Sequence, residues 1–265
     1  CEVDLTLRIN DDGSQYNRVR HFELLGIDVP SNILHENTLA RPLTDYGAKE
    51  RVDVVVTNPP FGGMEEDGIE SNFPQAYRTR ETADLFLVLI MRLLKKGGRG
   101  AIVLPDGPLF GEGVKTRIKE QLLKDFNLHT IVRLPNGVFN PYTGIKTNLL
   151  FFEKGKPTKH IWYYEHPYPP GAKSYNKTKP IRIEEFAAEK KWWKKRKENE
   201  FAWKVPVKEI IESSYNLDRK NPHTADEGPG DPDELLAQFQ DLQGQIDETR
   251  AKLLHELTDS LGGDA

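Results

Sequence analysis

The sequence predicts an α/β fold, a mostly parallel sheet with helices on both faces. Three short apolar runs, residues 52–57, 100–104 and 129–134, each end in a proline-containing loop, and two stretches of helical length separate them. Strand–helix–strand alternation of this kind is typical of parallel sheets. Two later apolar runs, residues 146–152 and 161–164, are joined by a glycine–proline turn and predict an antiparallel hairpin at one edge of the sheet.

The helices follow from hydrophobic periodicity. Residues 82–96 are apolar nearly all round, and Lys95-Lys96-Gly97-Gly98 predicts a basic last turn with a glycine stop. Residues 115–126 carry apolar side chains on one face only, which predicts an amphipathic helix. Before the first strand, residues 16–25 predict a further helix and residues 32–36 a short strand, and residues 52–57 are apolar enough to predict a buried parallel strand.

Composition divides the chain into four parts. An α/β domain is followed by a loop with a charged helical extension, by an acidic glycine-rich linker and by a terminal helix. The predicted bounds are residues 1–165, 166–223, 224–232 and 233–265.

The terminal helix carries an apolar stripe. Asp231, Pro232 and Glu234 form a helix start. Apolar or small residues then recur at alternating intervals of four and three, at Leu235, Phe239, Leu242, Ile246, Thr249 and Leu253. This heptad spacing predicts a coiled-coil helix that binds a partner, the alternatives being packing on its own domain or self-association.

Composition excludes several classes of protein. Among 265 residues, 37 are Lys or Arg and 41 are Asp or Glu, and this net charge of −4 argues against a general polyanion binder but leaves room for a local basic patch. One cysteine allows neither an internal disulfide nor a cysteine-based zinc site, and it fits a reducing, cytoplasmic setting. We expect no membrane span, no secretory signal and no metal site.

The most informative run is Asn58-Pro59-Pro60-Phe61, directly after the first main strand. An exocyclic amine of a nucleobase is a poor nucleophile because its lone pair is delocalised into the ring. Two acceptors on its hydrogens free that lone pair, and the side-chain oxygen of Asn58 and the carbonyl of Pro59 are the candidates. The proline pair holds the carbonyl rigidly, and Phe61 offers a face on which an extruded base can stack. Catalysis then needs positioning and hydrogen bonding, without a metal; the alternative is a strand end with a rigid loop and a packed phenylalanine.

Four runs together resemble one known family. They are residues 52–61, Glu81-Thr82-Ala83-Asp84-Leu85-Phe86, Val103-Leu104-Pro105-Asp106-Gly107 and Gly144-Ile145-Lys146-Thr147-Asn148-Leu149-Leu150-Phe151-Phe152. From about Gly26 to the last residue, the chain resembles the modification subunit of type I restriction–modification systems. The resemblance implies a Rossmann-like sheet and an S-adenosylmethionine-dependent DNA adenine-N6 methyltransferase. Asn58, Pro59, Pro60 and Phe61 then match the catalytic motif that holds the target adenine.

The resemblance also implies contacts with the cofactor. Asn37 lies where many relatives have an Asp or Asn near the cofactor's adenine, and Asp84, Leu85 and Phe86 match the helix segment that lines its methionine side. Each has an alternative role. Asn37 can cap a turn, Asp84 can stabilise the first turn of its helix, and Leu85 and Phe86 can belong to the core.

Two more residues match the family's target-base pocket. Thr147 and Asn148 lie where a hairpin of the family helps to wall that pocket, although both are equally compatible with a position on the strand surface.

Family features are also missing from the sequence. The glycine-rich cofactor loop of the form D-P-A-C-G-T-G-G-F is not present, and Gly62-Gly63 follows the catalytic motif instead of preceding it. The acidic residue for the cofactor ribose and the helical N-terminal domain are not found either. We therefore expect an incomplete sheet without its first strands, weak or no binding of S-adenosylmethionine by this chain alone, and completion by a missing N-terminal part of the same protein.

The resemblance implies partners as well. DNA and a separate specificity subunit are expected, and a nuclease subunit stays open. Two other functions remain: methylation of another amine or amide, such as cytosine N4 or a protein glutamine, and a non-catalytic assembly subunit.

The charged extension gathers basic residues around Trp192 and Trp193. They are Lys190, Lys191, Lys194, Lys195, Arg196 and Lys197. One interpretation is phosphate contact with aromatic support. The interpretation favoured by the interspersed acidic residues is a solvated helix face whose tryptophans pack on the body of the domain.

Overall fold

The computed structural model describes residues 5–7, 33–35, 37–61, 63–172, 174–224 and 232–261. The predicted helix at residues 16–25 lies outside these described residues. The chain forms two compact units, Cys1–His223 and Thr224–Ala265, which we describe separately.

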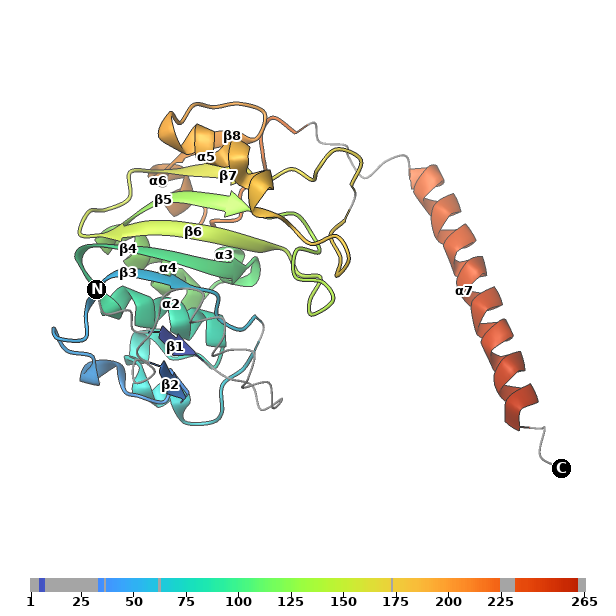
Figure 1. Ribbon diagram of the computed structural model, residues 1–265, viewed down its shortest axis with the longest axis horizontal. Coiled ribbons are helices and arrows are strands. Elements are labelled where there is room, and N and C mark those ends of the chain that lie inside the picture. Colours follow the sequence, from blue (N-terminus) through green and yellow to red (C-terminus); the bar gives the residue numbers. More distant parts are fainter. Residues whose placement is uncertain are drawn as a thin grey trace. The chain divides into compact units, whose positions relative to one another are not determined.

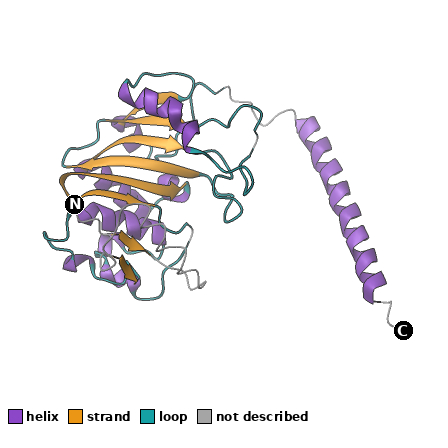
Figure 2. Cartoon of the chain, in the orientation of Figure 1, coloured by secondary structure: helices purple, strands orange, loops and turns teal. Residues whose placement is uncertain are grey.

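The first unit is built on one six-stranded mixed sheet (Figures 1 and 2). Across the sheet its strands are β3 (Val52–Thr57), β4 (Leu94–Pro105), β6 (Thr147–Lys154), β5 (Phe126–Arg133), β7 (His160–Glu165) and β8 (Ala202–Pro206). β3 pairs with β4, and β5 with β7, in parallel, whereas β6 is antiparallel to both of its neighbours and β8 is antiparallel to β7. The α/β class is therefore confirmed.

Two short strands form a separate parallel pair. They are β1 (Leu5–Leu7) and β2 (Ile33–His35), and β2 confirms the short strand predicted at residues 32–36.

The predicted edge hairpin is wrong. β6 and β7 do not pair: β6 lies between β4 and β5, and β7 lies on the far side of β5. The loop between them crosses the start of β5, where the Thr158 hydroxyl donates to Phe126 O and accepts from Leu128 N, each at 2.8 Å. β6 has apolar side chains towards both faces, and a strand of this composition is covered only in the middle of a sheet. The antiparallel edge is formed instead by β7 and β8, a strand that the sequence analysis did not predict.

Helices cover both faces of the sheet, as predicted. α2 (Thr82–Leu93), α3 (Gly107–Phe110), α4 (Val114–Asp125) and α6 (Val207–Glu212) pack on one face, and α5 (Ala187–Lys194) packs on the other (Figure 1). The described residues of this unit also form short 3-10 helices, η2 (Leu43–Asp45), η3 (Ile69–Asn72), η4 (Gln75–Tyr77) and η5 (Ile183–Phe186). The helical part of the predicted charged extension corresponds to η5 and α5.

β3 is parallel but not buried, which corrects the prediction. Val55 packs against the core, whereas Val54 and Val56 are 49% and 73% exposed. Because side chains alternate along a strand, these two valines lie on the opposite face from Val55. α5 covers that face only beside β5, β6 and β7, through ring contacts of Trp192 and Trp193, so β3 is left open there.

The predicted end of the first main helix is also wrong. α2 ends at Leu93, and residues 94–105 form β4, so Lys95, Lys96 and the two glycines belong to the strand. Leu94 pairs with Val52 and Arg99 with Val54, so the residues between them bulge, with Gly97 at a φ of 79°. Because Leu94 pairs with Val52 of β3, the helix ends at Leu93, before Gly97 and Gly98.

Lys119 of α4 anchors the short helix α3. Its ammonium group donates to Leu109 O and Gly111 O, both at 2.8 Å, and the residue is 2% exposed. Burial lowers the pKa of Lys119 to about 8. The lysine therefore caps the C-terminal end of α3 and holds the loop that follows β4 in place.

The lowered pKa predicts a pH-dependent stability. Below pH 8, Lys119 is protonated in both the folded and the unfolded state, so folding carries the full cost of burying its positive charge. Between pH 8 and 10.5 only the folded state releases it, so the free energy of unfolding rises with pH. Urea denaturation at pH 7 and pH 10 is expected to show the wild type gaining about 2–3 kcal/mol relative to Lys119→Met. Lys124→Met, an exposed position on the same helix, is the control, and an unchanged difference between Lys119→Met and the wild type contradicts the lowered pKa.

The second unit is one long helix, α7 (Pro232–Leu261), which confirms the predicted terminal helix. Within it Phe239, Leu242, Ile246 and Leu253 are between 40% and 62% exposed. No helix among the described residues has the length and apolar character needed to cross a membrane, and none of their side chains form a cluster of three or more potential metal ligands.

Candidate active site

The predicted catalytic run and the predicted base-pocket residues lie at one edge of the sheet. β3, β4 and β5 are parallel to one another, so their carboxyl ends lie at the same edge. Because β6 runs the other way, its first residues lie there too: Thr147 pairs with Pro105, and Asn148 pairs with Leu104 and Arg133. Ligands bind at the carboxyl ends of strands in open α/β sheets, so this edge is the candidate site.

The Asn58-Pro59-Pro60-Phe61 run directly follows β3. Asn58 and Pro60 are exposed, Pro59 is buried and Phe61 is half-buried. The Phe61 ring meets the ring of Phe139, from the loop after β5, with centroids 4.9 Å apart and planes at 80°. This edge-to-face contact brings the motif together with the β5–β6 loop.

Asn148 is held by a charged network behind this loop. Its Nδ2 donates to Asp106 Oδ1 at 2.7 Å, just after β4. Arg133 Nη2 lies 3.8 Å from the same oxygen, while Arg133 Nη1 contacts Asp218 Oδ1 at 2.5 Å and donates to Arg219 O at 2.6 Å. The network therefore holds the Asn148 side chain with its Nδ2 towards Asp106 and its Oδ1 away from Asp106.

Thr147 and Asn148 are each 1% exposed, so they do not lie on the strand surface. The Thr147 Oγ1 and the Asn148 Oδ1 have no hydrogen-bond partner among the described residues. Buried polar atoms normally have a partner, so two neighbouring exceptions at this edge are available to a ligand.

Asn37 reaches the start of α2 through Glu65. Asn37 Nδ2 donates to Glu65 Oε2 at 3.2 Å, and the Thr82 hydroxyl donates to Glu65 Oε1 at 2.7 Å. Asn37 Oδ1 also accepts from Leu39 N at 3.0 Å, the turn-capping bond that was its alternative role. The structure thus brings two of the predicted cofactor segments together.

Asp84 lies inside the protein. It is 2% exposed and its Oδ2 lies 3.0 Å from Lys115 Nζ, which also contacts Glu81. Burial lowers and these two carboxylates raise the pKa of Lys115, with a net increase, and burial raises the pKa of Asp84 against the opposing effect of Lys115. Leu85 and Phe86 belong to the main hydrophobic cluster, at 0% and 7% exposure.

A family comparison agrees with this geometry. The model of the family described as N-6 DNA Methylase matches residues 20–228, which is most of the chain. This chain belongs to the N-6 DNA methylase family.

Relatives of this chain are subunits of type I restriction enzymes. Over 247 residues the chain is 60% identical to the EcoEI methylase subunit of Escherichia coli, a match that covers 91% of this chain and 50% of that subunit. A solved modification subunit of a type I restriction enzyme from Vibrio vulnificus YJ016 is 52% identical, with a TM-score of 0.72 and coverage of 77% and 45%. A further structure, from work on complex assembly and conformational transition of the type I R-M system, is 38% identical, with a TM-score of 0.72 and coverage of 92% and 51%. The chain therefore spans about half the length of these relatives.

The structure adds residues that the sequence analysis did not assign to the site. Arg133 ends β5, and Phe139 lies in the loop after it. Asp106 belongs to one of the runs that resemble the family but had no role assigned, and Glu65 lies in an acidic loop. Of these four residues, only Asp106 was recognisable from the sequence as a candidate, because it directly follows a strand. The others meet the site through tertiary contacts.

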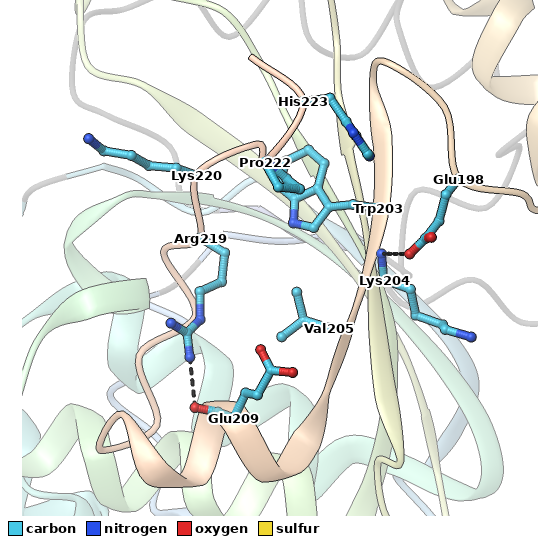
Figure 3. Close-up of a pocket in the computed structure, with 9 residues that line it drawn as sticks. All are labelled: Glu198, Trp203, Lys204, Val205, Glu209, Arg219, Lys220, Pro222 and His223. Carbon is cyan, nitrogen blue, oxygen red and sulfur yellow. Dashed lines mark hydrogen bonds between the residues drawn. The ribbon is translucent and has the colours of Figure 1, made fainter. Parts of the chain in front are cut away.

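A surface hollow lies elsewhere on the first unit. It measures about 340 Å³ and is bordered by β8, α6 and the chain that follows α6 (Figure 3). Its lining residues are Glu198, Trp203, Lys204, Val205, Glu209, Arg219, Lys220, Pro222 and His223. None of the predicted site residues lines it, so the hollow is not the candidate active site.

Asp106 is expected to matter for stability as well as for geometry. Asp106→Ala leaves the Asn148 Nδ2 buried without its acceptor, which costs about 1–3 kcal/mol of unfolding free energy in urea denaturation. Asp53→Ala is the matched control, because Asp53 pairs with Lys95 on the surface at 2.9 Å and such pairs contribute about 0–1 kcal/mol. Equal effects of the two substitutions would contradict the role given to Asp106.

Proposed function

We propose that this chain is the catalytic part of a DNA adenine-N6 methyltransferase subunit of a type I restriction–modification system, with S-adenosylmethionine as methyl donor. The observation that carries the proposal is the Asn58-Pro59-Pro60-Phe61 run at the carboxyl end of β3, in ring contact with Phe139. Family membership and the type I relatives support it.

Activation of the amine is the task of Asn58 and Pro59. The side-chain oxygen of Asn58 and the carbonyl of Pro59 accept the two hydrogens of the adenine N6 amine. The nitrogen then becomes tetrahedral, and its lone pair is free to attack. Pro59 has no N–H to compete, and its ring fixes the backbone. The catalytic effect comes from preorganised acceptors.

Two aromatic rings and one amide hold the extruded base. A nucleobase in a DNA duplex has to leave the stack before an enzyme can act on it. Phe61 supplies the stacking face, and Phe139 supports it from the edge. Asn148 Oδ1 is the unpaired polar atom that would face the edge of the base, since Thr147, the preceding residue of β6, points to the opposite face of the sheet.

The described residues do not form a ligand set for the cofactor. S-adenosylmethionine supplies a methyl group on a sulfonium centre when it is bound. Asn37 is hydrogen-bonded on both sides of its amide, Asp84 is paired with Lys115, and Leu85 is fully buried. We propose that these positions support the wall of the cofactor site from behind and that its polar ligands lie outside the described residues.

The cofactor proposal predicts weak binding by this chain. The sequence contains no glycine-rich loop of the family's form. Isothermal titration of the chain with S-adenosylmethionine is expected to show no stoichiometric heat, because the candidate polar groups are already engaged. Tight one-to-one binding would contradict this expectation and place a complete cofactor site within these 265 residues.

The function itself is tested by methyl transfer. With partner subunits and unmethylated duplex DNA, labelled methyl is expected on adenine N6. Label on cytosine N4 or on a protein glutamine would replace the proposal with another amine or amide substrate. Complex formation without label would make the chain a non-catalytic assembly subunit.

Asn58→Ala is expected to abolish turnover while DNA affinity is unchanged, because the side chain acts on the amine and not on the phosphates. Asn58→Asp, which keeps an acceptor oxygen, is the matched variant and is expected to retain part of the rate. Label incorporation and fluorescence anisotropy measure the two properties. A near-normal rate for Asn58→Ala would show that the assigned role is wrong.

Partners are proposed from α7. Its exposed apolar stripe includes Phe239, Leu242 and Ile246, and the helix holds seven acidic and two basic residues. A basic amphipathic helix of a specificity subunit fits both features. A nuclease subunit and a cytoplasmic setting belong to the same proposal.

A further inference from the structure

One segment of this net-acidic chain is strongly basic. Residues 177–197 contain nine Lys or Arg and three Asp or Glu, a net charge of +6, whereas the chain as a whole has −4. The segment covers the loop before η5, then η5, α5 and three residues beyond it. The rest of the chain therefore has a net charge of −10, opposite in sign to this segment.

The acidic residues of this segment are mostly turned inwards. Glu185 accepts from the Tyr175 hydroxyl at 2.5 Å and from Arg182 N at 2.7 Å. Glu189 is 5% exposed and contacts the ring of His166, itself 2% exposed. Two of the three carboxylates are thus engaged by other groups and form no ion pair with the lysines.

The lysines are turned outwards. Those of the helix and its end, Lys190, Lys191, Lys194, Lys195 and Lys197, are all exposed. None of them forms an ion pair with another described residue. A solvated helix face normally carries acidic partners three or four residues away, but here lysines stand four apart, an arrangement that destabilises an isolated helix.

Aromatic packing fixes this helix to the sheet. The Trp193 ring contacts the Phe151 ring at 4.9 Å, and Trp192 contacts Trp162 at 5.7 Å. Arg196 is not part of the exposed set, because its guanidinium lies 4.4 Å from the Trp193 ring centre. The tryptophans thus pack on the body of the domain, as favoured from the sequence, and they hold the lysines in fixed positions.

The basic segment adjoins the candidate active site. The Tyr168 hydroxyl donates to Asn136 O at 3.0 Å, and Asn140 Nδ2 donates to Tyr175 O at 3.2 Å. These bonds join the chain that leads into the basic segment to the β5–β6 loop that carries Phe139. His166, the partner of α5, directly follows β7 and donates its backbone N–H to Arg133 O at 2.9 Å. Figure 1 shows both loops leaving the same edge of the sheet.

We propose that the exposed face of residues 177–197 binds the phosphodiester backbone of the DNA duplex beside the extruded base. The proposal rests on the proposed function and adds the surface that holds the duplex. Lysine contacts to phosphates position DNA without reading its sequence, which suits a chain whose base contacts are confined to one pocket. The negative charge elsewhere repels DNA from other faces and restricts binding to this one.

Stabilisation of α5 by its own lysines is the competing explanation. Lys191 and Lys194 lie in the last turn, where cations interact favourably with the helix dipole. Lys177, Lys179 and Arg182 precede the helix and are exposed, so the dipole does not account for them. A second variant outside the helix therefore separates the two explanations.

The experiment measures affinity for duplex DNA as a function of salt, by fluorescence anisotropy on the full chain. The test variant carries Lys190→Gln, Lys191→Gln, Lys194→Gln and Lys195→Gln. The matched control removes the same charge from exposed lysines elsewhere, with Lys49→Gln, Lys96→Gln, Lys124→Gln and Lys156→Gln. A double variant, Lys177→Gln with Lys179→Gln, tests the loop without touching the helix.

The test variant is expected to bind at least tenfold more weakly than the control. Its slope of log affinity against log salt should be shallower by about 0.9 for each phosphate that the variant no longer neutralises. The double variant should show a smaller change in the same direction, with an unchanged thermal unfolding midpoint. Equal slopes for test and control variants, or an effect of the test variant on the unfolding midpoint alone, would overturn the proposal.

Methyl transfer separates this proposal from the proposed function. If the test variant loses DNA affinity but the wild-type complex transfers no methyl group to DNA, the DNA-binding face is supported and the proposed function is contradicted. If the wild type methylates adenine and the test variant binds DNA as tightly as the control variant does, the proposed function is supported and the DNA-binding face is contradicted.

Discussion

The antiparallel placement of β6 between two parallel strands is the constraint on which the site depends. A parallel β6 would bring its last residues to the carboxyl ends of β4 and β5. Because it is antiparallel, its first residues lie there, and Asn148 faces Asp106 and Arg133. Thr158 holds the crossing that makes this order possible, since its hydroxyl bonds twice to the start of β5. A loop residue at the opposite edge of the sheet thus determines which side chains meet at the candidate active site.

The same edge concentrates buried polar groups, which is unfavourable for stability and informative about function. A buried amide normally uses both its donor and its acceptor. Asn148 uses only its donor, towards Asp106, so the rigid network exposes an acceptor to whatever enters the pocket. By contrast, Asp84 is compensated by Lys115 within the protein.

Local sequence predicted the elements well and their neighbours poorly. The Asn58 run was recognisable because its chemistry lies in four consecutive residues after a strand. The β6–β7 hairpin was wrong because a glycine–proline turn between apolar runs indicates a reversal of the chain but not which strand lies beside which. Phe139 could not be assigned, because its contact with Phe61 joins residues 78 positions apart. Long-range pairing is decided by burial over the whole sheet, and no short window of sequence contains that information.

Charge is distributed so that one chain can meet two different kinds of surface. α7 has a net charge of −5 and an exposed apolar stripe, which favours a basic protein helix and disfavours nucleic acid. Residues 177–197 have a net charge of +6 and no exposed apolar stripe comparable to that of α7, which favours phosphates. A uniform charge of either sign would weaken one of these contacts. The small overall charge of −4 therefore describes neither of these two oppositely charged surfaces.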